Sequence, residues 1–215
     1  MLGSRDYHKL LSTEIEKLSQ NLAPLYDILD SNRIHAAETI GCTRYSYYDR
    51  TEPLTSEVSS TLLSVLKRAG SNFLKSPSIE YKVDDLILIV TADMIIDDMI
   101  VNYVLVNSLP ETADPKDLLY TNACLFGFDK NNGIILYTTV DGRHIEFFVP
   151  RSNKMFEQVV RRARILSILL KQKNTPVIEP SDFCKTCKYN KRCFIQIGKG
   201  TSSLEEIFGL GKAGQ

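Results

Sequence analysis

Three cysteines lie within ten residues near the end of the chain, and this spacing constrains the fold more than any other feature of the sequence. They stand in the segment FCKTCKYNKRC, residues 183–193, as Cys184, Cys187 and Cys193. Thiolates at such short spacings can converge on one ion or cluster, because a tight turn brings successive sulfur atoms to the same side. Basic residues between them offset the accumulated negative charge: Lys185, Lys188, Lys191 and Arg192. The pattern predicts metal ligation without specifying the metal.

A cysteine metal site usually has four ligands, and the chain holds two further cysteines. Cys124 lies in the apolar stretch DLLYTNACLFGF, where a small buried thiol is expected. Cys42 lies in ETIGCTRYSYYDR, among polar and aromatic residues where no core position requires it. We therefore interpret Cys42 as the fourth ligand. A free thiol at Cys42, with zinc held by the other three cysteines and a histidine such as His144, is the alternative.

Composition describes an ordinary globular chain in a reducing compartment. The 215 residues suit one domain with extensions, and 26 basic residues balance 26 acidic ones, so net charge does not argue for a nucleic-acid partner. An odd number of cysteines, with three of them crowded together, argues against a secreted disulfide framework. The longest apolar run, LILIVTADMII, is interrupted by Asp93 and falls short of the ~20 residues of a membrane span. The first residues, MLGSRDYHKL, contain no hydrophobic signal core. We expect a cytoplasmic protein with no membrane partner.

Periodicity predicts a mixed α/β chain. Apolar residues at helical spacing predict helices over residues 6–30, 54–69, 115–127 and 151–171, the first of them interrupted by Pro24. Alternating or β-branched runs predict three strands at 78–83, 85–96 and 99–107, arranged as a meander. The turn Asp141-Gly142 between two further alternating runs predicts a hairpin.

This order of elements, with one cysteine far upstream and three near the C-terminus, resembles the CRISPR-associated RecB-like nucleases of the Cas-four type. CTRYSYYDR is similar to the segment of that family that supplies the first cysteine, and FCKTCKYNKRCF is similar to its closing segment. The resemblance spans most of residues 36–194. It implies a restriction-endonuclease-like, or PD-(D/E)xK, core with a mixed sheet flanked by helices. It also implies a 4Fe-4S cluster on Cys42, Cys184, Cys187 and Cys193, with zinc as the alternative.

The resemblance divides the chain into four parts. Residues 1–75 form an N-terminal helical region with the first cluster cysteine, and residues 76–175 form the nuclease-like core. Residues 176–199 form the cluster segment, and residues 200–215 form a tail.

The catalytic positions of the family are mostly lost. Its metal-binding aspartate corresponds to Asp93, but the Glu-x-Lys of the next strand corresponds to Leu105 and Asn107. Leucine cannot bind magnesium, and asparagine carries no cationic head. The histidine and glutamine motifs of the family fall on residues of other types: Ser56, Ser60, Leu118 or Tyr120, and Asn122. We expect an inactive core with Asp93 as a remnant.

Asp97 and Asp98 offer one route to residual activity. If strand 85–96 ended early, these carboxylates would converge with Asp93 on a metal and give an active single-stranded DNA exonuclease. A solvated turn between two apolar runs is the interpretation we favour.

Two surfaces suggest partners. Arg161, Arg162 and Arg164 on the last helix, with Arg44 and Tyr47 beside Cys42, could hold phosphates and stack bases of DNA. A solvated helix face and packing tyrosines explain the same residues equally well. In the tail, Leu204, Ile207 and Phe208 could bind a protein partner. Their spacing weakly resembles a sliding-clamp box, although a helix folding back on its own domain is favoured.

The sequence thus predicts an inactive Cas-four-like 4Fe-4S protein. It would act as a DNA-associated binding or scaffold subunit in DNA processing, repair or CRISPR-type defence. The rival hypotheses are an active exonuclease that uses carboxylates outside the usual motif, and a protein-interaction module without a nucleic-acid role.

Overall fold

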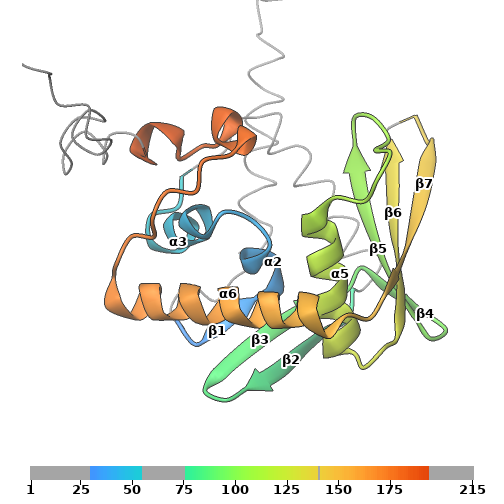
Figure 1. The fold of residues 1–215 in the computed structure, drawn as a ribbon, viewed down its shortest axis with the longest axis horizontal. Helices are drawn as coiled ribbons and strands as arrows, with labels where there is room; N and C mark the ends of the chain where they lie inside the picture. The colour runs from blue at the N-terminus through green and yellow to red at the C-terminus, as the bar shows by residue number, and fades with distance from the viewer. Residues whose placement is uncertain (1–29, 55–75, 140, 194–215) are drawn as a thin grey trace, which may run out of the picture. The chain divides into compact units, whose positions relative to one another are not determined.

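The computed structural model describes residues 30–54, 76–139 and 141–193 (Figure 1). The helices expected at 6–30 and 54–69 lie almost entirely outside the described residues. The same is true of Ser56, Ser60 and the tail residues Leu204, Ile207 and Phe208. The chain divides into two compact units, residues 1–176 and 177–215, and each is described by itself. Among the described helices, none is both long and apolar enough to cross a membrane.

A three-stranded sheet forms around the most apolar segment of the chain. Its strands are β1 (Arg33–His35), β2 (Ser78–Val83) and β3 (Leu86–Thr91), in the order β1-β3-β2. Strand β3 has the sequence LILIVT and lies at the centre, where Leu88 and Val90 are fully buried. It pairs in parallel with β1 and antiparallel with β2. The strand expected at 78–83 is confirmed, whereas three-residue β1 is too short for its pattern to be recognised.

A second sheet contains β4 (Met94–Ile96), β5 (Met99–Val106), β6 (Asn132–Thr139) and β7 (His144–Pro150), in that order. The pair β5–β6 is parallel, and the other two pairs are antiparallel. The expected hairpin is confirmed as β6–β7, and Gly142 has φ of +85°, a value that glycine adopts without steric cost.

The prediction of one continuous strand at 85–96 is wrong, and so is the meander. The segment breaks at Ala92 and Asp93 into β3 and β4, which belong to different sheets, and β3 does not pair with β5. At the break, the Asp93 amide donates to the Asn102 side chain over 3.2 Å, and the Asp93 carboxylate accepts from the Tyr103 amide over 2.9 Å. Side-chain hydrogen bonds therefore replace the strand ladder at this position.

The described residues include the α-helices α2 (Ala36–Thr39), α3 (Thr43–Thr51), α5 (Pro115–Gly127) and α6 (Asn153–Gln172). Helices α5 and α6 confirm the expectations at 115–127 and 151–171. The Asp114 carboxylate accepts from the Lys116 amide at the start of α5, and the Ser152 hydroxyl accepts from the Met155 amide at the start of α6. Helix α3 was not predicted, because its sequence TRYSYYDRT has no apolar period.

The helices flank the two sheets (Figure 1). Helix α5 is the crossover between the parallel strands β5 and β6 and packs against β5, β6 and β7, while α6 packs against α5, α2, α3 and the first sheet. The mixed α/β class predicted from the sequence, with mixed sheets flanked by helices, is confirmed, and the arrangement is consistent with a restriction-endonuclease-like core.

A buried tyrosine ties the start of α5 to the second sheet. The Tyr137 hydroxyl on β6 donates to the Asp117 carboxylate over 2.6 Å and accepts from the Asp114 amide over 2.9 Å. Burial, together with the hydrogen bond to Asp117, raises the pKa of Tyr137 well above its usual range. The phenol therefore stays protonated as a donor throughout the physiological pH range.

Candidate functional site

The second unit presents its three cysteines on a segment wound by local hydrogen bonds. The Cys187 amide donates to the Cys184 carbonyl over 3.4 Å, and the Cys193 amide donates to the Tyr189 carbonyl over 2.9 Å. The 3-10 helix η1 (Asp182–Thr186) contains the first cysteine. Tyr189 is fully buried and anchors the segment, whereas all three thiols are half-buried. Such thiols remain reachable by a metal.

In the first unit, Cys42 occupies the N-cap of α3. Its backbone is extended, with φ −69° and ψ 123°, and its carbonyl accepts from the Ser46 amide over 3.2 Å. Cys42 is half-buried, and the carbonyl of the preceding Gly41 accepts a hydrogen bond from Arg162. The N-terminal end of a helix favours negative charge, which suits a thiolate ligand.

Cys124 has a different environment. It is fully buried in α5, and its thiol donates to the Thr91 carbonyl over 3.6 Å. The Asn102 side-chain amide donates to its sulfur over 3.7 Å. The prediction of a buried structural thiol at Cys124 is confirmed.

The donor set fits a thiolate-bound metal centre. None of the five cysteines, all of which lie in described residues, forms a disulfide. Within the ranges that the structure describes, no three His, Cys, Asp or Glu side chains are already gathered around one point. The fit therefore rests on donor chemistry: half-buried thiols on a tightly wound segment with adjacent lysines. His144, the alternative ligand, is exposed at the start of β7.

Asp93, interpreted from the sequence as a catalytic remnant, is hydrogen-bonded to the backbone of the neighbouring strand. Its side chain is buried and accepts from the Tyr103 amide, as described above. Of the two positions that the resemblance compares with Glu and Lys, Leu105 is half-buried in β5 and Asn107 is exposed just beyond that strand. Asn102 accepts a hydrogen bond from the Asp93 amide and links it to α5, because the Asn102 side-chain amide also donates to the Thr121 hydroxyl over 3.1 Å.

The α5 residues that the resemblance compares with the family's glutamine motif also have internal partners. The Asn122 carbonyl oxygen accepts from the Ser152 amide over 2.7 Å, and its amide donates to the Leu118 carbonyl over 3.1 Å. The Tyr120 hydroxyl donates to the Thr91 carbonyl over 2.5 Å. These side chains fasten α5 to the start of α6 and to the end of β3.

Asp97 and Asp98 form the turn of the β4–β5 hairpin. Both are exposed, Asp97 has φ of 53°, and the Asp98 carboxylate pairs with the Lys130 ammonium at 2.6 Å. The interpretation of these residues as a solvated turn is confirmed.

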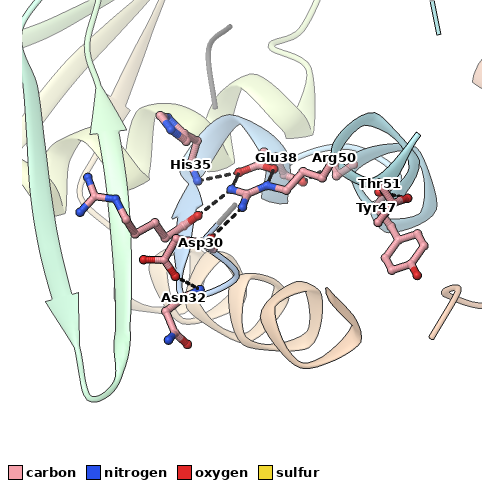
Figure 2. Close-up of polar contacts among 9 residues, drawn as sticks. Asp30, Asn32, His35, Glu38, Tyr47, Arg50 and Thr51 are labelled. Atoms are coloured by element: carbon pink, nitrogen blue, oxygen red, sulfur yellow. Dashed lines mark hydrogen bonds and ion pairs between the residues drawn. The ribbon is translucent and has the colours of Figure 1, made fainter. Parts of the chain in front are cut away.

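The segment after Cys42 is held by a buried ion pair that the sequence did not reveal. Figure 2 shows the Arg50 guanidinium of α3 facing the Glu38 carboxylate of α2, and both side chains are 1% exposed. Two Arg50 nitrogens donate to the two Glu38 oxygens over 2.6 Å each. Arg50 also donates to the carbonyls of Asp30 and Arg33, over 2.9 and 2.6 Å. The pair thus fixes α3, and with it the position of Cys42, to β1 and α2.

Burial limits the proposed nucleic-acid residues near Cys42. Arg44 and Tyr47 are each 6% exposed, and the Arg44 Nε donates to the Tyr48 hydroxyl over 3.3 Å. Bases and phosphates cannot reach side chains buried in this way, so the packing interpretation describes both residues better in this structure.

The arginines of α6 differ in what surrounds them. Arg161 is exposed. Arg162 is half-buried and donates to the Gly41 carbonyl, while Arg164 pairs with Asp84 in the β2–β3 turn. Of the three, Arg161 is the best placed for a phosphate.

Comparisons with known proteins give a likeness of fold. No protein-family model matches the sequence, and no curated protein matches it. A solved structure described as "Crystal structure of SSO0001" is similar with a TM-score of 0.62 and 18% identity, over 86% of this chain and 95% of that chain. An alkaline exonuclease (LHK-Exo) from Laribacter hongkongensis has a TM-score of 0.43 and 9% identity, over 85% of this chain and 99% of that chain. The first of these similarities shows that the fold extends across most of both chains.

Proposed function

We propose that the protein is a Cas-four-like 4Fe-4S protein whose nuclease-like core is inactive and acts as a DNA-associated binding or scaffold subunit. The observation that carries this proposal is the environment of Asp93. Its carboxylate is buried and bonded to the Tyr103 amide, and the family's Glu and Lys positions hold Leu105 and Asn107. A metal-dependent nuclease needs several carboxylates and a water-activating group at this place.

The cluster forms the second part of the proposal. Cys42, Cys184, Cys187 and Cys193 would supply four thiolates in a reducing, cytoplasmic setting, with zinc as the alternative metal. When bound, the cluster would cross-link chain segments that are far apart in sequence, and such a link restricts the unfolded chain.

The first test is a nuclease assay. We expect no cleavage of single-stranded DNA above background with magnesium or manganese, because Leu105 and Asn107 stand where the resemblance calls for a metal-binding Glu and a Lys. The assay should compare the wild type with Asp93→Asn, whose amide oxygen still accepts from the Tyr103 amide. Metal-dependent cleavage by the wild type that Asp93→Asn abolishes would establish the rival function, an active exonuclease.

The second test concerns DNA binding. We expect weak, sequence-independent binding that falls with added salt, with a slope of about −0.7 per phosphate contact on single strands. Arg161→Ala should weaken it, because Arg161 is exposed on α6. Arg143→Ala is the matched control, since Arg143 is exposed but pairs with Asp141 in the β6–β7 turn. An absence of binding at low salt would transfer the scaffold role to protein partners, and deletion of residues 201–208 in a pull-down would then test the tail.

A further inference from the structure

Arg162 connects the last helix of the first unit to the loop that holds Cys42. Its Nη2 atom donates to the carbonyl of Gly41, across 121 positions of sequence. Helix α6 packs against both α2 and α3, so this hydrogen bond fixes the loop between those two helices to a long rigid element. The neighbouring Arg161 is exposed and lacks this role.

The guanidinium of Arg162 also carries a second donor atom, Nε. Its Nε atom is buried and finds no hydrogen-bond acceptor among the described residues. Leaving such a donor unpaired costs about 1–3 kcal/mol, so buried donors of this kind usually meet a water, an ion or a ligand. Arg162 holds Gly41, the residue before Cys42, and its Nε–H has no acceptor among the described residues. It is therefore suited to donate a hydrogen bond to an acceptor bound at Cys42.

The space beside Gly41 is open. A Cβ atom built on Gly41 would meet no atom of the described residues within 4 Å apart from those of its chain neighbours. Open space beside Gly41, a half-buried thiol at Cys42 and an unused buried donor therefore occur within one stretch of structure.

We infer that Arg162 is the positioning residue of Cys42 and donates a hydrogen bond to the sulfur atoms bound there. This inference rests on the proposed cluster. Groups that hold a ligand in place commonly change metal affinity by about 10–100-fold when they are removed. Hydrogen bonds to cluster sulfurs stabilise the more negative, reduced state and so raise the reduction potential. Arg162 would therefore raise both the affinity for the cluster and its reduction potential.

The test compares Arg162→Gln with Arg161→Gln in the full chain, purified anaerobically. Two quantities are measured: the rate of iron loss to a chelator, and the midpoint potential of the cluster followed by electron paramagnetic resonance during a redox titration. Arg162→Gln should lose iron about tenfold faster and show a lower midpoint potential. Arg161→Gln should match the wild type in both. Arg162→Lys, which keeps the charge but lacks the Nε–H, should lie between the two.

The thermal midpoint of each iron-free protein measures any purely structural loss. A lost contact between α6 and the Gly41 loop would lower this thermal midpoint but would not by itself alter the reduction potential. An unchanged potential together with unchanged iron loss in Arg162→Gln would overturn the inference while leaving the cluster in place. A wild-type protein without iron or sulfide would overturn the proposed cluster, and the inference with it.

Discussion

Replacing Arg50 by Met should lower the free energy of unfolding by about 3–5 kcal/mol, which is among the largest effects expected of any single substitution in this chain. The guanidinium and the Glu38 carboxylate are both 1% exposed, so the substitution leaves a buried carboxylate without its counter-charge. It also removes the donors that satisfy the carbonyls of Asp30 and Arg33. Arg50→Lys keeps the charge but not the two-pronged geometry, and it should recover only part of the loss.

Denaturant unfolding followed by circular dichroism measures this effect. The matched control is Arg143→Met, since Arg143 pairs with Asp141 at a site where both side chains are more than half exposed, at 66% and 59%. Exposed pairs contribute only about 0–1 kcal/mol. If Arg50→Met and Arg143→Met destabilised the protein equally, the buried pair would not hold α3 in the way described here.

On the function proposed above, replacing Cys42 or Cys187 by Ser should remove the 4Fe-4S cluster altogether. A hydroxyl is a poor substitute for a thiolate, and an incomplete ligand set exposes a cluster to loss of iron. The variants should be colourless and should unfold more readily, because the link between distant segments is gone.

Cys124→Ser is the control for these variants. The buried Cys124 thiol donates to the Thr91 carbonyl and accepts from Asn102, and a serine hydroxyl can do both. This variant should keep the broad absorbance at the blue end of the visible spectrum that a 4Fe-4S cluster would give. Full colour in Cys42→Ser would exclude Cys42 from the ligand set and favour a histidine such as His144.

The sequence predicted those elements whose signals are local. Alternation identified β2, the turn Asp141-Gly142 identified the β6–β7 hairpin, and apolar residues at helical spacing identified α5. Each of these signals lies within a few residues of the element that it predicts.

Long-range features escaped prediction because no local pattern encodes them. The break at Asp93 depends on hydrogen bonds with Asn102 and Tyr103, about ten residues further along the chain. The pairing of Arg50 with Glu38 likewise depends on how α2 and α3 meet. When this packing is unknown, a segment of arginines and tyrosines fits a nucleic-acid-binding surface and a buried polar core equally well.

The candidate site could be predicted only where residue type and spacing indicate the chemistry. Cysteine spacing predicts a ligand set, which stays a prediction, and the apolar context of Cys124 correctly marked it as a core thiol. The burial of Arg44 and Tyr47 could not be read from sequence, because it follows from the packing of α3.

Chemical analysis of iron and acid-labile sulfide in the anaerobically purified wild-type protein tests the central claim most directly. We expect about four iron and four sulfide per chain, and a brown solution that bleaches as iron is removed. One zinc per chain, with neither iron nor sulfide, would contradict the cluster while leaving the cysteine ligands in place.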